Sequence, residues 1–327
     1  MSSPKEPGLS CFSTRVARRL GAILIISLAC VALLAVIGAC FEFVATRHIA
    51  SSNPPAGRLV NINGRRTHIF CLGSGTPSVI FISGLGETYA SWSKVQSDVA
   101  RSTRACSYDR AGLGWSDPSP GPRDVNQMAG ELHELLAASE LLPPYVVVGH
   151  SLGGGVAQAF DAKFPQEVAG MILVDSVTPG FLSRMPLDAW DQNMLRTARR
   201  MKRLAPFGVA RLQGNCQVDN RPLIHCADFW ATFTAERDSL PGSVRELAEI
   251  RSIGDTPLQV LSRDPDPAVG WGSAESRRAW EEMQEELPKL STHGRQHVVS
   301  GATHYIQDDR PEAVITAISD VLSVVRH

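Results

Sequence analysis

The stretch that most constrains this chain is a run of three valines followed by a glycine-rich turn. It reads VVVGHSLGGG over residues 146–155 and continues into a helical pattern. The β-branched run is typical of a buried strand, and Gly149 and Gly153 allow a turn too tight for a β-carbon. Ser151 then lies at the start of a helix, where backbone N–H groups favour negative charge. The stretch predicts a strand, a sharp turn and a helix, in the G-x-S-x-G pattern of an exposed nucleophilic serine.

Buried strands alternate with helices on both sides of this turn. Residues 59–71 predict a hairpin, because two alternating strands flank Asn63-Gly64. Further strands are predicted at 79–82, 105–108, 171–174, 258–261 and 296–299. Amphipathic helices are predicted at 125–136 and from Pro311 onward, and a charged helix at about 273–287. This alternation predicts an α/β fold with a mostly parallel sheet covered by helices on both faces.

The alternation stops between residues 178 and 254. This segment has helical patterns and several prolines but no buried strand, so we expect a helical cap over the carboxyl edge of the sheet. Its apolar side chains are interleaved with five basic ones, namely Arg196, Arg199, Arg200, Lys202 and Arg203. These charges are typical of a solvated helix face, and they also suit a lipid-like substrate near a membrane surface.

The N-terminal region contains one long uncharged segment. Residues 20–41 read LGAILIISLACVALLAVIGACF, and 22 residues at ~1.5 Å each give ~33 Å of helix, enough to cross a bilayer. We expect a tail at 1–19, a transmembrane helix or signal anchor at 20–44, a linker at 45–57 and one domain at 58–327. Arg15, Arg18 and Arg19 precede the apolar segment, so the positive-inside rule places the N-terminus in the cytoplasm and the domain in the periplasm or outside the cell. A lipoprotein anchored at Cys40 and a secreted protein with a cleaved signal peptide are the alternatives.

Charge and cysteine content limit the partners. The formal net charge is −1, so there is no basic excess that would indicate nucleic-acid binding. The seven cysteines do not follow a metal-binding spacing, and no metal is expected. Cys216 and Cys226 are a candidate disulfide in an oxidising compartment. The sequence does not indicate an oligomeric state.

A serine nucleophile at neutral pH requires a neighbouring base, itself oriented by a carboxylate. His304 follows the last predicted strand and precedes the closing helix, which is the place of the base in enzymes with this order of elements. His150 is less suitable because side chains of adjacent residues diverge at a turn. We expect His150 to support the site by packing or hydrogen bonding.

Backbone N–H groups must also stabilise the charge that develops on the substrate oxygen. One donor is expected from Leu152, directly after the serine, and the other from Leu85 in the Gly84-Leu85-Gly86 loop after the strand at 79–82. Glycines let this backbone approach a substrate closely.

Residues 58–327 resemble the α/β-hydrolase superfamily, with the cap at about 178–254 least similar. The resemblance is carried by SGLG at 83–86, YDRAGLGWS at 108–116, GHSLGG at 149–154 and Thr303-His304. It implies an eight-stranded, mostly parallel sheet and no metal or organic cofactor. This sequence departs from the family's pattern at Ser83, where histidine is usual, and it lacks the glycine that usually precedes the acid. The resemblance also implies that the second and fourth strands are antiparallel neighbours, so that Cys71 lies near Cys106, either as a disulfide or as two reduced thiols.

Three aspartates are candidates for the acid. Asp264 is favoured because Arg263-Asp264-Pro265 resembles the strand-end signature of related sequences. Asp266 follows in the same turn and would require a longer loop. Asp175 ends the preceding strand, where some lipases of this fold carry the acid.

The resemblance implies a membrane-anchored serine hydrolase of bacterial type that cleaves a small to medium carboxylic ester through an acyl-enzyme. A serine at the turn argues against epoxide or haloalkane hydrolysis, for which relatives use aspartate. Acyl transfer to another acceptor, or hydrolysis of amides, thioesters or lactones, are alternatives. A non-catalytic ligand-binding module on the same fold is an alternative of another class.

Overall fold

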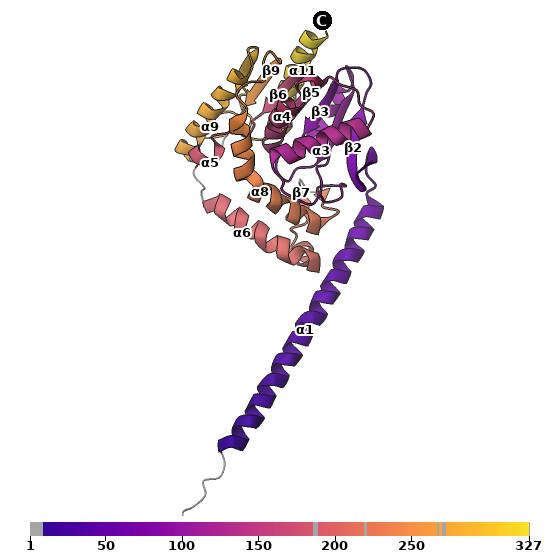
Figure 1. The fold of residues 1–327 in the computed structure, drawn as a ribbon, viewed down its shortest axis with the longest axis vertical. Helices are drawn as coiled ribbons and strands as arrows, with labels where there is room; N and C mark the ends of the chain where they lie inside the picture. Colours follow the sequence, from indigo (N-terminus) through magenta and orange to yellow (C-terminus); the bar gives the residue numbers. More distant parts are fainter. Residues whose placement is uncertain (1–8, 186–188, 219–220, 267, 270–272, 327) are drawn as a thin grey trace, which may run out of the picture.

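The computed structural model describes residues 9–185, 189–218, 221–266, 268–269 and 273–326. Its centre is an eight-stranded sheet in the order β1-β2-β4-β3-β5-β6-β9-β10 (Figure 1). The strands are β1 (Arg58–Ile62), β2 (Arg65–Leu72), β3 (Ser78–Ile82), β4 (Ala105–Tyr108), β5 (Tyr145–His150), β6 (Val168–Val174), β9 (Leu258–Ser262) and β10 (Gly294–Val298). In this sheet the β1–β2 and β2–β4 pairs are antiparallel, and the other five pairs are parallel. The predicted mostly parallel, eight-stranded sheet is confirmed.

Helices cover both faces of this sheet. One face packs against α3 (Val125–Ala138) and α4 (Leu152–Lys163), and the other against α2 (Ser93–Val99) and α11 (Pro311–Val325). The domain also contains α9 (Ala274–Glu286), α10 (Ile306–Asp309) and the 3-10 turns η1 (Tyr89–Trp92), η2 (Pro165–Glu167) and η4 (Leu287–Leu290). β3 and β5 are buried along their whole length because helices lie on both sides of them.

The antiparallel edge has the expected turn and a disulfide. Asn63 and Gly64 have φ of 52° and 84°, the two positive values that a two-residue hairpin turn requires. Cys71 lies opposite Cys106 in the β2–β4 ladder, and the two form a disulfide. Cys216 and Cys226 form a second disulfide.

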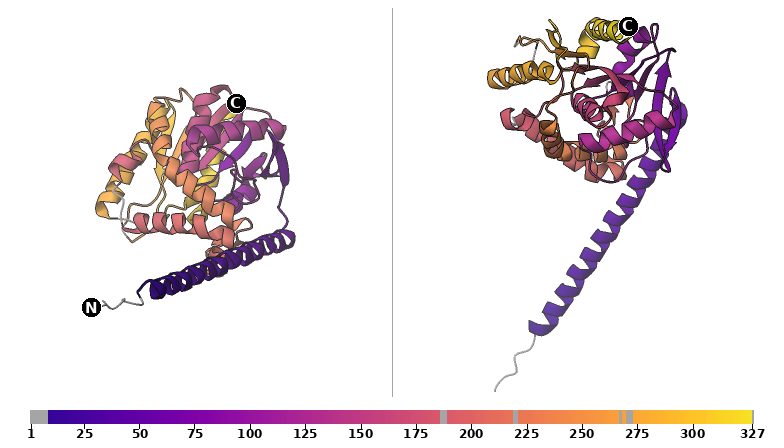
Figure 2. Two further views of the ribbon diagram at one scale, coloured as in Figure 1. Left: turned by 60° about the horizontal axis from the view of Figure 1, so that its bottom comes forward. Right: turned by 45° about the horizontal axis from the view of Figure 1, so that its top comes forward.

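The segment between β6 and β9, which we call the cap segment, is mainly helical but also contains a short hairpin that the sequence did not indicate. It contains α5 (Phe181–Arg184), α6 (Ala189–Leu204), η3 (Ala205–Phe207), α7 (Val209–Leu212), a small hairpin of β7 (Gln217–Val218) and β8 (Arg221–Pro222), and the long α8 (Cys226–Glu249). Figure 2 shows these elements on one side of the domain, beside the N-terminal helix.

The N-terminal helix α1 (Leu9–Ser52) projects away from the domain (Figure 1). It is long and apolar enough to cross a membrane, with a mean hydropathy of 3.0 over its most apolar 18 residues. The segment at 45–57, which we expect to link the anchor to the domain, is helical over its first part, because α1 continues to Ser52. No proline or glycine occurs between residue 45 and Pro54, and the Asn53 N–H still donates to the carbonyl of Ile49 at 3.0 Å.

Candidate active site

Ser151 occupies the sharp turn between β5 and α4. Its φ is 51° and its ψ is −118°, a conformation that residues other than glycine rarely adopt. A β-carbon on Gly149 would overlap the carbonyl of Gly153, and one on Gly153 would overlap the carbonyl of Ile82. The glycines on either side of Ser151 are therefore required by close backbone packing, as the sequence pattern indicates.

His304 and Asp175 form a buried pair at the same edge of the sheet. Nδ1 of His304 lies 2.5 Å from Oδ2 of Asp175. The second carboxylate oxygen of Asp175 accepts a hydrogen bond from the indole Nε1 of Trp280 at 2.8 Å and from the Arg263 N–H at 3.2 Å. Asp175 is fully buried and the His304 side chain is 15 % exposed. The carboxylate fixes the orientation of the imidazole, so Nε2 is the ring nitrogen that can act as a base.

The pair keeps a charged carboxylate beside a neutral imidazole. Burial opposes ionisation of Asp175, but its contact with His304 and the nearby Arg263 outweigh burial, and its pKa lies below the ordinary value. Burial lowers the pKa of His304, and the contact with Asp175 does not fully offset this effect. His304 is therefore neutral at pH 7, the state in which a base can accept a proton.

The preference for Asp264 as the partner of His304 is wrong. Asp264 is half-buried, and its carboxylate accepts the Gly301 N–H at 2.6 Å and the Asp266 N–H at 2.9 Å. Asp266 in turn accepts the Ala268 N–H at 2.8 Å. Both carboxylates shape loops, because β9 ends at Ser262 and the chain after Arg263 turns towards solvent. Asp175 directly follows β6, the strand next to β9, and its carboxylate reaches His304.

Ser151 lies at the same sheet edge as this pair. Its N–H donates to the carbonyl of Val174, the residue before Asp175, at 3.1 Å. Its neighbour His150 reaches the carbonyl of His304 from Nε2 at 2.9 Å, and the two imidazole rings are 4.7 Å apart between centroids. The structure thus brings residues 151, 175 and 304 together from three separate parts of the chain.

His150 supports the site through hydrogen bonds, as expected. Its Nδ1 lies 3.0 Å from the carboxylate of Glu87, and its Nε2 contacts the carbonyl of His304. Because both nitrogens face acceptors, the protonated ring is favoured. Burial opposes this charge, but the Glu87 carboxylate outweighs it and raises the pKa of His150. His150 therefore ties the loop that carries His304 to the loop after β3.

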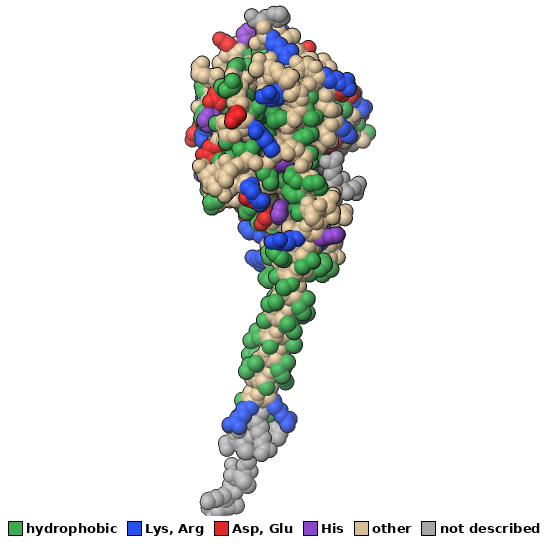
Figure 3. Space-filling model, turned by 90° about the vertical axis from the view of Figure 1, so that its right-hand side faces the viewer, with side chains coloured by type: hydrophobic (Ala, Val, Ile, Leu, Met, Phe, Trp, Pro, Cys, Tyr) green, Lys and Arg blue, Asp and Glu red, His purple; other side chains and the backbone are tan. Residues whose placement is uncertain are grey.

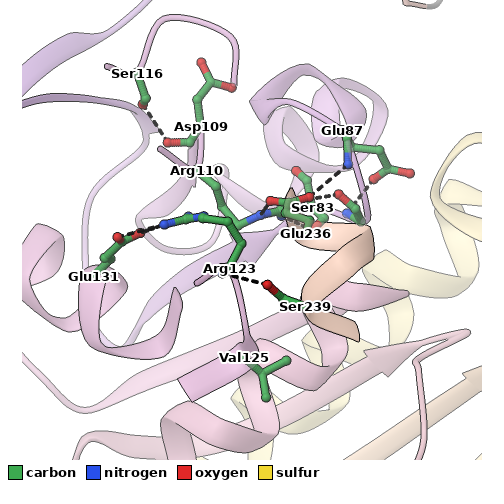
Figure 4. A network of polar contacts seen from close by, with 12 residues as sticks. Ser83, Glu87, Asp109, Arg110, Ser116, Arg123, Val125, Glu131, Glu236 and Ser239 are labelled. Carbon is green, nitrogen blue, oxygen red and sulfur yellow. Dashed lines mark hydrogen bonds and ion pairs between the residues drawn. The ribbon is translucent and has the colours of Figure 1, made fainter. Parts of the chain in front are cut away.

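The loop after β3, residues 83–86, is held by a buried ion pair (Figure 4). The Arg110 guanidinium donates to the carbonyls of Ser83 and Gly84, and to the Glu236 carboxylate at 2.7 and 3.0 Å. Glu236 also accepts the Gly86 N–H at 3.3 Å. Leu85 is at the centre of this braced loop. Leu152 is the first residue of α4, so its N–H is one of the donors that a helix start leaves unpaired.

Several of these supporting residues have no signal in the sequence. Trp280 lies on the charged helix α9, about a hundred residues after Asp175, and Glu236 lies within α8 of the cap segment. Arg110 belongs to the motif at 108–116, which could have identified it as a bracing residue. Within the described residues, no group of three or more His, Cys, Asp or Glu side chains is arranged to hold a metal ion.

Known proteins place this chain in a family. The sequence profile described as "Alpha/beta hydrolase family" matches residues 79–317. The chain belongs to the alpha/beta hydrolase family. This is the family that the motifs indicate.

Individual relatives are distant. A Schizosaccharomyces pombe protein is 28 % identical over 240 residues, 67 % of this chain, and the chain spans only 42 % of that relative's length. YqjL of Bacillus subtilis is 25 % identical over 250 residues, covering 76 % of this chain and 85 % of YqjL. A thermophilic esterase structure from Thermogutta terrifontis superposes with a TM-score of 0.56 at 22 % identity, covering 84 % of this chain and 100 % of the esterase. At this identity the structural likeness supports the fold alone.

Proposed function

We propose that this protein is a serine hydrolase that cleaves carboxylic esters through an acyl-enzyme. The observation that carries the proposal is the contact of His304 with the buried Asp175 beside the strained turn at Ser151. In the proposed reaction the Ser151 oxygen attacks the ester carbonyl and His304 takes its proton. The amides of Leu85 and Leu152 stabilise the oxyanion, and the alcohol leaves with the proton from His304. Water, activated by the same imidazole, then releases the acid.

A mostly apolar pocket between two helices of the cap segment supports an acyl substrate of small to medium length. The pocket of about 210 Å³ lies between α6 and α8 and is lined by Asn193, Met194, Thr197, Phe229, Trp230 and Phe233. Phe233 packs on Gly86, where an added β-carbon would lie 2.6 Å from its ring. The apolar lining favours an alkyl or acyl group over a charged one. Amides, thioesters and lactones share the same chemistry and are distinguished by assay.

We further propose that α1 anchors the protein in a membrane, with the N-terminus in the cytoplasm and the hydrolase domain outside. The apolar run at 20–41 is solvent-exposed over nearly all its length, and Arg18 and Arg19 precede it. An exposed apolar helix of this length is unfavourable in water and favourable in a bilayer.

Labelling with a fluorophosphonate probe tests the hydrolase proposal. We expect the wild-type protein to label at one serine and the Ser151→Ala variant to lose the label completely, because only an activated serine attacks the probe. Ser300→Ala is the control: Ser300 is an exposed serine on the loop before His304, and this variant should label normally. A folded wild-type protein that does not label would favour a non-catalytic binding module.

Hydrolysis of p-nitrophenyl esters of increasing chain length, measured beside the matching anilide, thioester and lactone, tests the substrate class. We expect the ester series to be the fastest and to decline once the acyl chain exceeds the pocket. A faster anilide, thioester or lactone would overturn the assignment to carboxylic esters.

The pH dependence of kcat/KM should follow the lowered pKa of His304. The neutral imidazole is the working base, so activity is present above its pKa and is lost as the pH falls through it. Because burial lowers this pKa, the acid limb should have its midpoint below the ordinary value of 6.5. A profile for p-nitrophenyl butyrate from about pH 4 to about pH 8 measures this midpoint. A midpoint above 6.5 would contradict the neutral, desolvated histidine described here.

A further inference from the structure

The cap segment is fixed to the end of the apolar run in α1. The backbone of Gly38 packs directly on the carbonyl of Phe207, and a β-carbon on Gly208 would lie 2.6 Å from the ring of Phe41. Next to these contacts Arg211 forms two hydrogen bonds to Glu42, at 2.6 and 2.9 Å. The two side chains of this ion pair are only 11 % and 8 % exposed. This close packing holds η3 and α7 at a defined height along α1.

That height corresponds to the outer boundary of a bilayer. Gly38 lies within the uncharged run at 20–41, and Glu42 is the first charged residue after it. Gly38 lies four positions before Glu42 in the helix, which is ~6 Å along the axis. Phe207 therefore lies below the level of Glu42, beside the apolar part of α1. Helices and turns that contact a membrane from one side reach a similar depth of about 5–10 Å.

The surface of the cap segment at this height is apolar and basic. Phe207 is 42 % exposed and Leu212 is 74 % exposed. Five basic side chains of α6 are exposed, of which Arg199 pairs with Asp238 at 3.2 Å and Arg200 donates to Gln213 at 3.0 Å. α6 lies on the side of the domain from which α1 projects (Figures 1 and 2). In Figure 3 the projecting helix is an apolar column with Lys and Arg side chains at its far end and near the domain.

We propose that the face formed by α6, η3 and α7 is a membrane-contact surface. Phe207 and Leu212 insert into the outer half of the bilayer, and the exposed basic residues of α6 contact anionic lipid headgroups. The occupant is the same bilayer that α1 crosses, since the two apolar surfaces are continuous at Gly38 and Phe207. This inference rests on the proposed membrane anchoring of α1.

Nitroxide accessibility in the full-length protein tests the surface. Cys11, Cys30 and Cys40 are replaced by Ala, the disulfide cysteines are kept, and one label is introduced at a time in nanodiscs of phosphatidylcholine and phosphatidylglycerol. Labelled positions are Phe207→Cys and Leu212→Cys. Leu142→Cys is the matched control, because Leu142 is also 74 % exposed but precedes β5 at the opposite edge of the sheet. Leu28→Cys, within the apolar run, reports whether α1 crosses the bilayer.

We expect the ratio of oxygen to nickel-chelate collisions at 207 and 212 to exceed that at 142 several-fold, with the highest ratio at 28. If the label at 28 is buried in lipid but the ratios at positions 207 and 212 equal the ratio at position 142, the proposed contact surface is wrong and the anchoring of α1 still holds. A water-accessible label at 28 would instead overturn the anchoring proposal.

The contribution of headgroup charge is tested separately. We expect Arg196→Glu with Arg203→Glu, or nanodiscs of phosphatidylcholine alone, to lower the ratio at 212. An unchanged ratio under both conditions would refute the role of the basic residues.

Discussion

Replacing Asp175 by Asn should reduce kcat by about 10⁴-fold, whereas Asp264→Asn and Asp266→Asn should retain most of the activity. The Asp175 carboxylate accepts a hydrogen bond from the Nδ1–H of His304 at 2.5 Å. An amide can present an N–H to Nδ1, which moves the imidazole proton to Nε2 and removes the base that faces the serine. The measurement is kcat and KM for a p-nitrophenyl ester in all three variants.

The structure supplies the controls for this prediction. In the Asp175→Asn variant the Trp280 indole can still donate to the new side-chain amide oxygen, so the fold should survive, and unchanged circular dichroism should confirm it. Asp264 is half-buried and accepts the N–H groups of Gly301 and Asp266, and Asp266 is exposed and accepts the N–H of Ala268. Equal losses in the Asp175→Asn and Asp264→Asn variants would show that loop stability, rather than orientation of His304, limits the rate. Full activity in Asp175→Asn would refute the proposed triad.

Breaking the buried Arg110–Glu236 pair should destabilise the domain by about 3–5 kcal/mol. The side chains are 2 % and 0 % exposed, so Arg110→Met leaves the Glu236 carboxylate without its partner in a low-dielectric interior. It also frees the carbonyls of Ser83 and Gly84, which hold the loop around Leu85. We therefore expect a loss of both unfolding free energy and kcat, measured by urea unfolding in detergent and by ester hydrolysis.

Two further variants separate charge burial from general disruption. The double variant Arg110→Met with Glu236→Leu removes both charges and should recover part of the lost stability. Arg184→Met breaks a surface pair with Glu282 and Glu286 and should cost less than about 1 kcal/mol. If Arg110→Met and Arg184→Met were equally mild, the bracing role of the buried pair would be wrong.

The sequence indicated most of the fold because its signals are local. The valine run before Gly149 and the Asn63-Gly64 turn specify backbone conformations that only strands, a sharp turn and a tight hairpin satisfy. Local patterns also identified Ser151 at the turn and the loop containing Leu85. The helix that continues past residue 45 was missed because the serines and asparagine at 51–53 suggested a linker, although only Pro54 stops a helix.

The identity of the acid was a question of distance in space, and the local sequence could not answer it. Asp175 and Asp264 both follow strands at the carboxyl edge of the sheet, and Arg263-Asp264-Pro265 resembled the more familiar motif. Which carboxylate meets His304 depends on where the loops after β6, β9 and β10 turn, and the contacts with Trp280 and Arg263 N–H hold Asp175 there. The same holds for Glu236, whose partner lies 126 positions earlier.

By itself, then, the order of residues determined an apolar helix, an alternating α/β domain, and a strained serine followed much later by a histidine. These depend on side-chain periodicity, on β-carbon sterics and on the transfer of apolar groups from water, all of which act over a few neighbouring residues. Only the tertiary structure decided which acid contacts the histidine, which ion pair braces the loop after β3, and how the cap segment packs on α1 at Gly38 and Glu42. Those pairings join groups far apart in the chain, and their energies arise only once the folded chain has removed water from around them.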